Sequence, residues 1–547
     1  MCRKIESSLM LFLIFTCIWF GIVRTIENEQ FDYFTFTTWG LSNEILSNNH
    51  LLFRPYINVP YKSGPKHHAN EYSVLFLPHT LLSISYIVTS IPYQYYSLII
   101  VLSYIIILYL ITKYSLHHKF VIFLTTLLLI IYHQTYPTYS FFYISIGILF
   151  YWYTLFILLH CYRSALRLSS SVLTGFLFLI ASNWSYYTST FMTAVVSFGI
   201  SLTLLITRLF SYRLPSQSFT ITELKLYFTT SMGAIFLLVF LNPIVLSLGD
   251  TRSGLDFNYV LTFLLREAVH WYLPSAGDNA DLEEYFVDSV YPVLHTISTV
   301  SVFLLVILLI ILMVRYKVNI VKMIFKDKDL NLSTILLFAL LVLVITHNLV
   351  YALFLYPSIH TYPHQVLRTF AIGMLIMLVI KVSNKIKIRY RNWFLVIAYM
   401  LAILLVLAPL YRSIVTSISM DHVTPIKLYS TSTSSITFLT EKTKNELFLF
   451  TDSRIAGYVY YRLTHLNESI IINVQGFLAP PFNYFDNCKR IAECYYLIAR
   501  SFKTIPLRIA QAPWIFIKPL GEKYCLMIEE NSLIYNDSLS EILLVVK

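Results

Sequence analysis

The chain has 547 residues, of which 57% are hydrophobic, 16% aromatic and only 13% charged, and its mean hydropathy is +0.66. Soluble domains usually carry about a quarter charged residues, so this composition excludes a chain that covers itself with a solvated surface. A net charge of +11 would suggest a nucleic-acid partner in a soluble protein. Here much of the positive charge stands in short loops between apolar runs, as the positive-inside rule predicts. The sequence therefore predicts a polytopic membrane protein with no nucleic-acid partner.

The first apolar run covers residues 8–23 and follows Arg3 and Lys4. It lacks a small-residue cleavage site, so we expect a retained signal anchor with its N-terminus in the cytosol. Further apolar runs predict spans at about 73–91, 95–112, 120–132, 139–161, 171–183, 187–207, 226–247, 293–314, 333–354, 366–380 and 393–411. The runs at 120–132 and 171–183 are short for a hydrocarbon layer of roughly 30 Å, which favours re-entrant or broken helices there.

The basic residues of three loops, 208–225, 315–332 and 381–392, predict that these loops are cytosolic. Counting spans from them puts 248–292, 355–365 and everything after residue 411 on the outer face. A cytosolic N-terminus and an outer C-terminus need an odd number of crossings, whereas the pattern gives twelve, and the discrepancy lies before residue 208. We expect an all-α polytopic membrane bundle of about 11–13 transmembrane helices.

Two long segments are not membrane spans. Residues 24–72 form the first outside loop, and residues 412–547 form a tail with enough charge for a small extracytoplasmic α/β domain. In this tail the pattern predicts strands at 447–450 and 469–474 and helices at 454–463 and 491–502. The transmembrane domain then covers 1–411. No internal repeat supports a transporter built by duplication.

Two acids, Glu29 and Asp32, stand within ten residues of the end of the first span. The residues that follow, 33–46, can form a helix lying along the interface. A partly desolvated carboxylate at the outer mouth is placed to accept a proton from an arriving hydroxyl. The alternative is that acids flank many signal anchors simply because loops are polar.

A second polar group, at His67, His68, Glu71 and Tyr72, precedes the predicted span at 73–91. Histidines with a glutamate can bind a metal or steady a phosphate, and solvated loop residues are the alternative. The acidic loop 248–292 resembles no calcium loop, so a solvated cap is the alternative to a divalent ion there. We assign no metal ligand, and no cofactor is certain, although a divalent metal stays open.

Arg368 falls within a late apolar run, where a charge costs roughly 2.5–3.5 kcal/mol unless it has a partner. With His360 and His364 nearby in the outside turn, it suits a lipid-linked phosphate, which accepts a planar bidentate donor. The alternative is an arginine that snorkels to the interface.

Several motifs of soluble enzymes are absent from the sequence. It contains no G-x-G-x-x-G and no P-loop, so cytosolic nucleotide binding has no support. It also contains no nucleophile elbow and no H-E-x-x-H. The six cysteines form no C-x-x-C pair, so neither a zinc ribbon nor a disulfide scaffold is indicated.

The order of these features resembles the GT-C class of membrane glycosyltransferases, particularly archaeal and bacterial members that use polyprenyl-phosphate sugars. An outside acid precedes an interfacial helix at 31–34, and a span is entered through Tyr72 and Pro78. An outside Tyr-Pro turn stands at 134–139, and a polar turn ends a short span at 183–188. Arg368 opens a late span. The segment 450–458 is similar to an Asp-x-Arg-x-x-Gly pattern that begins extracytoplasmic domains in archaeal members.

The resemblance implies a cell-membrane enzyme that moves a sugar from a polyprenyl-phosphate donor to an acceptor hydroxyl on the outer face, with inversion. Asp32 would be the catalytic base, and Arg368 would stabilise the departing phosphate. The other residues expected to bind substrate are Glu29, His67, His68, Tyr72 and His364. The partners would be the lipid-linked sugar, a glycolipid, glycan or protein acceptor, and membrane lipid. A multi-pass transporter or lipid flippase, or a non-catalytic component of cell-surface polysaccharide assembly, is the alternative.

Overall fold

The structure is a computed structural model of residues 1–547. It describes residues 33–48, 76–115, 119–135, 143–163, 168–185, 187–211, 221–241, 290–316, 372–373, 375–383, 392–405, 407, 411, 434–435, 437–439, 441, 447–451, 458–459, 461–462, 472–476, 493–499, 507–508, 516–517, 532–536 and 540–544. Most of these residues are helical.

The helices and helical turns follow one another from Tyr33 to Tyr316. They are α2 (Tyr33–Asn48), α4 (Phe76–Thr89), the 3-10 turn η1 (Tyr93–Tyr95), α5 (Tyr96–Ser115), α6 (Lys119–Thr135), α7 (Tyr143–Arg163), α8 (Leu168–Ser185), α9 (Tyr187–Ser211), α10 (Ile221–Phe236), the π-helical turn η3 (Leu237–Leu241) and α14 (Val290–Tyr316). Residues 375–383 and 392–405 are also helical. The apolar runs predicted between 95 and 247 and at 293–314 are confirmed as helices, whereas the run at 333–354 lies outside the described residues.

The two short apolar runs belong to longer helices. The run at 120–132 lies in α6, which has 17 residues, and the run at 171–183 lies in α8, which has 18 residues. Both helices continue through polar residues at their ends, so the apolar run alone underestimates their length. No helix in the part of the chain that the structure describes is both long and apolar enough to cross a membrane.

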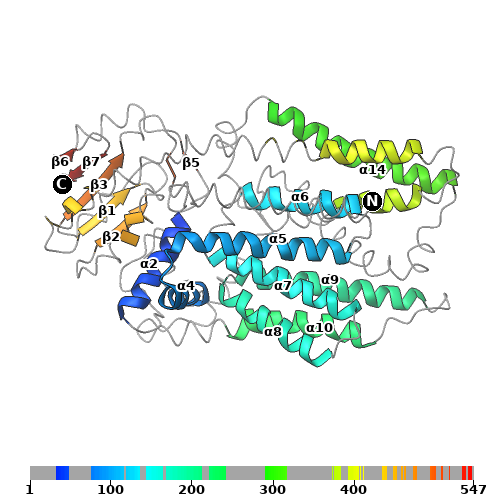
Figure 1. Ribbon diagram of the computed structural model, residues 1–547, viewed down its shortest axis with the longest axis horizontal. Coiled ribbons are helices and arrows are strands. Elements are labelled where there is room, and N and C mark those ends of the chain that lie inside the picture. The colour runs from blue at the N-terminus through cyan, green and yellow to red at the C-terminus, as the bar shows by residue number, and fades with distance from the viewer. Residues whose placement is uncertain are drawn as a thin grey trace.

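The longer helices form a bundle in which α5, α7, α9 and α14 run along the long axis of the molecule (Figure 1). α7 packs against both α5 and α8, and α9 packs against α10. Two tyrosines are fully buried among them and hydrogen-bond to backbone carbonyls of α7. Tyr104 donates to the Ser145 oxygen at 2.7 Å, and Tyr227 donates to the Leu158 oxygen at 3.4 Å. Each buried phenol therefore has an acceptor, as a buried polar group requires.

At Gly373 the chain lies very close to a side chain of α6. A Cβ atom built on Gly373 would overlap the side chain of Thr125 in α6, lying 2.9 Å from its Cγ2 atom and closer still to its Oγ1 atom. Thr125 is fully buried. Only glycine lets the helical segment at 372–373 lie this close to α6.

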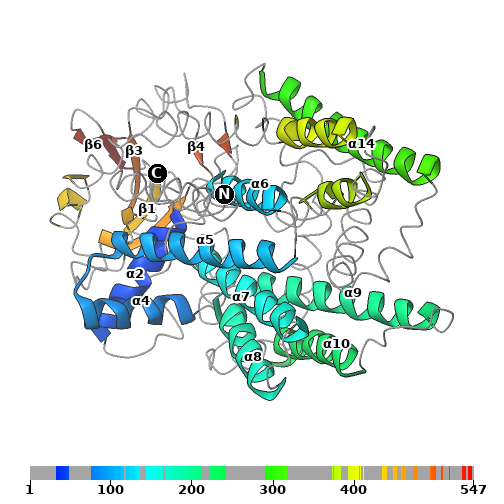
Figure 2. The same ribbon diagram turned by 45° about the vertical axis from the view of Figure 1, so that its right-hand side comes forward.

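α2 and α4 do not follow the bundle axis. In Figure 1 α4 is seen almost end-on and α2 runs steeply across the ends of the long helices, while Figure 2 shows α4 lengthwise. The run predicted to span the membrane at 73–91 contains a helix at 76–89 that lies across the long helices. The apolar pattern shows which face of a helix is buried, but it does not show how the helix is inclined to its neighbours.

The tail contains a five-stranded mixed sheet in the order β2-β1-β3-β7-β6. β1 pairs in parallel with β2 and β3, and β7 pairs antiparallel with β3 and β6. The strands are β1 (Leu447–Thr451), β2 (Ile472–Gly476), β3 (Glu493–Ala499), β6 (Ser532–Asn536) and β7 (Ser540–Leu544), with β4 (Leu507–Arg508) and β5 (Phe516–Ile517) in a separate pair. The predicted strand at 447–450 is confirmed as β1. The second predicted strand, at 469–474, overlaps β2.

The predicted helix at 491–502 is wrong, because residues 493–499 form the central strand β3. Tyr495 and Leu497 are buried at alternate positions, and the Leu497 carbonyl accepts a hydrogen bond from Thr451 Oγ1 at 2.8 Å. Pairing on both edges decides the conformation here, since tertiary context overrides a weak local preference for helix. Of the predicted helix at 454–463, residues 458–459 and 461–462 are described, and they are helical.

Candidate functional site

Every residue that the sequence assigns to the site lies outside the described residues. These residues are Glu29, Asp32, His67, His68, Tyr72, His364 and Arg368. Their assigned roles stay predictions. The structure does describe the helices that adjoin them in the chain, because α2 begins at the residue after Asp32 and α4 begins four residues after Tyr72.

α2 confirms the helix predicted at 33–46, and it packs closely on α4 through hydroxyl groups. Ser42 Oγ donates to the carbonyl oxygens of Thr38, at 2.8 Å, and His79, at 3.2 Å. Ser83 Oγ donates in turn to the carbonyl oxygens of Ser42, at 3.1 Å, and His79, at 2.8 Å. Small hydroxyl residues let two helices approach closely and form hydrogen bonds across the contact.

His79 lies in the middle of this contact and was not singled out from the sequence. Only 3% of its surface is exposed, and its carbonyl oxygen accepts the hydrogen bonds from Ser42 and Ser83. His79 is three residues from the start of α4, so at a rise of about 1.5 Å per residue this contact with α2 lies within about 5 Å of that start. The chain segments that carry Asp32 and Tyr72 thus lead into two helices that pack on each other.

The polar turn expected at 183–188 separates α8 from α9, and in it Asn183 and Ser185 are buried while Trp184 is half-buried. Ser182 Oγ donates to the Gly147 oxygen at 3.0 Å and lies 2.7 Å from Ser189 Oγ, so the turn is bonded to α7 and to its own following helix. Trp184 contacts Phe76, the first residue of α4, with ring centroids 5.1 Å apart. This contact fixes the start of α4 against the α8–α9 turn.

An aromatic cluster joins α2 to the tail. The ring of Trp39 lies 6.0 Å from that of Tyr93 and 5.6 Å from that of Tyr461, and Trp39 is almost fully buried. Tyr93 also donates a hydrogen bond to Asn43 Oδ1 of α2 at 2.9 Å. Burial raises the pKa of both the Tyr93 and the Tyr461 hydroxyl, so both stay protonated near neutral pH. Figure 1 shows the sheet of the tail beyond α2, at the end of the bundle where this cluster lies.

The described part of the site supplies packing and hydrogen bonds. Within it, no group of three or more His, Cys, Asp or Glu side chains is placed to hold a metal ion. The sequence pattern could not have paired Trp39 with Tyr461, because these residues are more than 400 positions apart and the chain has 42 tyrosines. The described helices α2 and α4 therefore adjoin the predicted site residues in the chain, and the chemistry assigned to those residues stays a prediction.

The comparisons with known proteins give only weak structural likeness. No protein-family model matches the sequence, and no curated protein matches it. Among solved structures the chain is similar to ArnT from Cupriavidus metallidurans in the apo state, with 9% identity, a TM-score of 0.40, and coverage of 100% of this chain and 99% of that chain. The structure of ArnT from the same organism bound to undecaprenyl phosphate gives 9% identity, a TM-score of 0.39, and coverage of 99% and 98%. TM-scores this low do not establish a shared fold, so the likeness assigns the chain to no family.

The contact between Tyr461 and Trp39 leads to a first prediction. Changing Tyr461 to Ala removes one aromatic pair, worth about 0.5–1.5 kcal/mol beyond the burial of its area, and should loosen the tail from α2. Limited proteolysis of the detergent-purified protein is expected to release the tail faster than from the native chain. The matched control is Tyr461→Phe, which keeps the ring and should be cleaved at the native rate. Equal cleavage of Tyr461→Ala and the native chain would contradict the docking of the tail on α2.

Proposed function

We propose that the chain is an integral membrane glycosyltransferase that moves a sugar from a polyprenyl-phosphate donor to an acceptor hydroxyl on the outer face of the membrane. The observation that carries this proposal is the placement of α2. This helix begins at the residue after Asp32, lies across the end of the bundle, and is held there by α4 and by Tyr461 of the tail. A carboxylate next to such a helix would stand at the mouth of the bundle.

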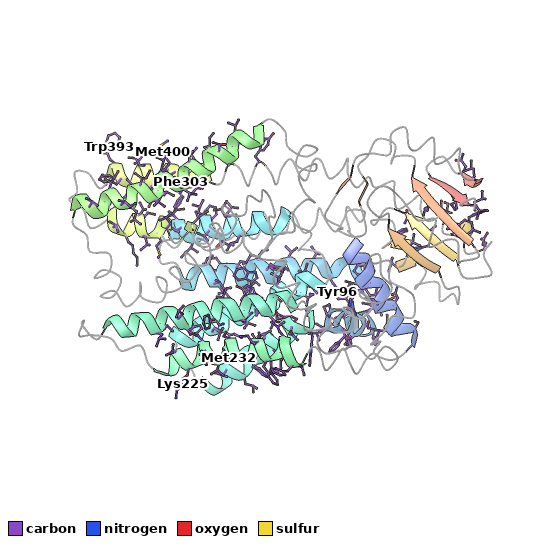
Figure 3. All side chains as sticks on the ribbon, turned by 180° about the vertical axis from the view of Figure 1, so that it is seen from behind. Tyr96, Lys225, Met232, Phe303, Trp393 and Met400 are labelled. Carbon is purple, nitrogen blue, oxygen red and sulfur yellow. The ribbon has the colours of Figure 1, made fainter. Side chains whose placement is uncertain are left out.

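A membrane setting is supported by apolar side chains that face outward along whole helices. On α14 the exposed apolar residues recur every three or four positions and so form one continuous stripe along the helix. Figure 3 labels one of them, Phe303. The exposed residues of α14 are Val293, Ile297, Val300, Phe303, Leu304, Val306, Ile307, Ile310, Ile311 and Val314. Similar exposed residues lie on α8, α9, α10 and the helix at 392–405. A soluble monomer rarely exposes apolar patches of this extent, whereas a bilayer covers them.

The two ends of the bundle differ in a way that supports the expected orientation. Figure 3 shows Tyr96 at the end next to α2 and the tail, and Trp393 at the opposite end. α5 runs from Tyr96 to a last turn that contains Lys113, and the helix at 392–405 begins directly after the basic loop 381–392. Basic residues collect on the cytosolic side of membrane proteins. The end that carries α2 and the tail is then the outer end.

In the proposed reaction Asp32 takes the proton from the acceptor hydroxyl as the hydroxyl oxygen attacks the anomeric carbon of the donor. A new bond forms between that carbon and the acceptor oxygen, on the face opposite to the bond that breaks. The bond from the anomeric carbon to the phosphate oxygen breaks with its electron pair, so the configuration is inverted and polyprenyl phosphate leaves. The guanidinium group of Arg368, with His364, would stabilise the charge on the departing phosphate.

The remaining predicted site residues would bind the substrates around these two groups. Glu29, His67, His68 and Tyr72 belong to the first outside loop, which leads into α2 and α4. A histidine pair with a carboxylate could also hold a divalent metal, and the proposed proton and phosphate chemistry does not depend on one. The N-terminus would be cytosolic, and the tail would be an extracytoplasmic domain.

A transporter or lipid flippase is the second candidate function, because it would also be polytopic and could use Arg368 on a phosphate. A non-catalytic component of cell-surface polysaccharide assembly is the third. Release of free polyprenyl phosphate separates the enzyme from both, since neither alternative breaks the bond between the sugar and the phosphate. In this test the purified chain in lipid nanodiscs is given a panel of polyprenyl-phosphate hexoses and pentoses together with membrane acceptors. Mass spectrometry should detect the release of polyprenyl phosphate from at least one of these donors. No release from any donor, in nanodiscs or in native membranes, would contradict the proposal.

The role of Arg368 gives a second prediction. Arg368→Lys keeps the positive charge but loses the planar pair of donors, and the two residues are not equivalent on a phosphate. Losing one hydrogen bond to a charged group costs about 1.5 kcal/mol, so release of polyprenyl phosphate should slow roughly tenfold. Arg389→Lys, in a predicted cytosolic loop, is the matched control and should release at the native rate. Native activity of Arg368→Lys would show that the arginine makes no directional bond to the leaving group.

A further inference from the structure

We propose that α4 is a helix that lies on the outer surface of the membrane with one face against lipid, so that the chain enters and leaves α4 on the same side. This inference rests on the membrane placement in the proposed function and is independent of sugar transfer. The occupant of the exposed face is the lipid surface itself.

Two faces of α4 differ in exposure up to its last turn, where Tyr86 on the buried side is also 39% exposed. Pro78, His79, Leu82 and Ser83 are buried, and they recur at the spacing of one helix face. Ile84, Ile87 and Val88 are exposed by 52%, 67% and 76%, and they recur at the same spacing on another face. No charged residue occurs between Phe76 and Thr89. The exposed face thus offers aliphatic groups without any charge that would keep it in water.

Both flanks of α4 contact the same end of the bundle. At its start Phe76 packs on Trp184, which stands at the turn between α8 and α9. Just after its end Tyr93 bonds to Asn43 and contacts Trp39, both on α2. A helix that crossed the membrane would place its two flanks about 30 Å apart along the bundle axis. α4 instead lies across that axis, as Figures 1 and 2 show.

Apolar side chains are exposed on α5 as well. Ile99, Leu102 and Ile106 are exposed along this helix at helical spacing. The same lipid would therefore cover the outward face of α5 and, at its outer end, the exposed side of α4. A surface-lying helix with one apolar and one protein-bound face is a stable arrangement at a bilayer interface.

This placement also removes the discrepancy in the number of crossings. Without the run at 73–91, eleven predicted spans remain, and an odd number is what a cytosolic N-terminus and an outer tail require. The turn between α5 and α6 then becomes cytosolic, and it is flanked by Lys113 and Lys119, as the positive-inside rule favours. The Tyr-Pro turn at 134–139 falls on the outer face, where the sequence also placed it.

The test is the side from which the residues after α4 can be labelled. Ile91 and Tyr95 are exposed by 42% and 47%, and Lys113 is exposed at the other end of α5. Three single-cysteine additions are made in the full chain: Ile91→Cys, Tyr95→Cys and Lys113→Cys. Intact cells are treated with a membrane-impermeant maleimide polymer, which shifts the gel band of the protein once for each labelled cysteine. The native chain, run in parallel, gives the shift from its own six cysteines.

We expect Ile91→Cys and Tyr95→Cys to gain one shift in intact cells, and Lys113→Cys to gain it only after permeabilisation. If both Ile91→Cys and Tyr95→Cys gain the shift only after permeabilisation, α4 crosses the membrane and the inference is overturned. If neither is labelled under either condition, these positions are not at the surface and the inference also fails. Either failure leaves the glycosyltransferase proposal standing, whereas recovery of the native chain in the soluble fraction would remove the membrane setting from both.

Discussion

Asp32→Asn is expected to lower the rate of sugar transfer by roughly 10²–10⁴-fold at equal membrane abundance, because an amide cannot take the proton from the acceptor hydroxyl. The asparagine side chain has nearly the same size and can still accept a hydrogen bond, so folding and substrate binding should change little. The loss should therefore appear in kcat, while KM for the lipid-linked donor stays close to that of the native chain. The measurement is the initial rate of polyprenyl-phosphate release by the purified protein.

Glu27→Gln is the matched control for this change. Glu27 lies five residues before Asp32 in the same outside loop, has no role in the proposed mechanism, and carries the same charge. Its neutralisation should leave kcat at the native value. Equal activity of Asp32→Asn and the native chain would show that Asp32 is not the base, and equal losses in both variants would show that only the charge of the loop matters.

Gly373→Ala is expected to destabilise the protein by about 3 kcal/mol, at the upper end of the cost of overpacking a core. The added methyl group would overlap the side chain of Thr125, which is fully buried. In a helix threonine adopts mainly two rotamers, and the full burial of Thr125 leaves its side chain little space to swing aside. The segment at 372–373 and α6 would have to separate, and the contacts between them would loosen. The midpoint of thermal unfolding in detergent should fall, and the fraction of protein recovered as a monodisperse species should decrease.

Two other helical glycines serve as controls for the intrinsic effect of alanine. A Cβ atom at Gly175 would lie 3.6 Å from Ile157 Cγ2, and one at Gly233 would lie 3.8 Å from Phe176 Cε2, and both are ordinary contacts. Alanine is the better helix former by up to about 1 kcal/mol, so Gly175→Ala and Gly233→Ala should be neutral or slightly stabilising. A Gly373→Ala protein as stable as these two would contradict the close approach of 372–373 to α6.

The helices could be predicted from the sequence because apolar runs are long and polar residues mark their ends. The orientation of α4 could not be predicted in this way. Its apolar run looks like a short span, and what holds it across the bundle is a set of hydrogen bonds from the hydroxyl groups of Ser42 and Ser83 to backbone carbonyls of α2 and α4. The sequence does not show which hydrogen-bond partner a serine, threonine or histidine in an apolar run will have in the folded protein.

The tail shows the same limit for strands. β1 could be predicted because four consecutive apolar residues stand at 447–450 and two of them are phenylalanines, which favour strands. β3 was expected to be a helix, since its composition suits either state, and it becomes a strand because β1 and β7 pair with its two edges. Pairing of this kind depends on residues about 50 positions away in both directions. Such long-range pairing leaves no local pattern in the sequence.

For the site, sequence order could suggest the chemistry, because an acid before an interfacial helix and an arginine in an apolar run are each unusual. The order could not show what positions these groups. The contacts of Trp39 with Tyr93 and Tyr461 join three distant segments, and the contact of Trp184 with Phe76 joins two more. In the proposed enzyme these contacts hold the helix that follows Asp32, so the tail would help to position the base.

The most direct test of the central claim is a mass-spectrometric profile of glycans and glycolipids in three strains. One strain lacks the protein, and the other two carry the native chain or Asp32→Asn at matched membrane abundance. The account predicts that at least one sugar-bearing species disappears without the protein, returns with the native chain, and does not return with Asp32→Asn. The mass difference would name the class of sugar. A profile that is identical in all three strains would contradict the claim that the chain transfers a sugar.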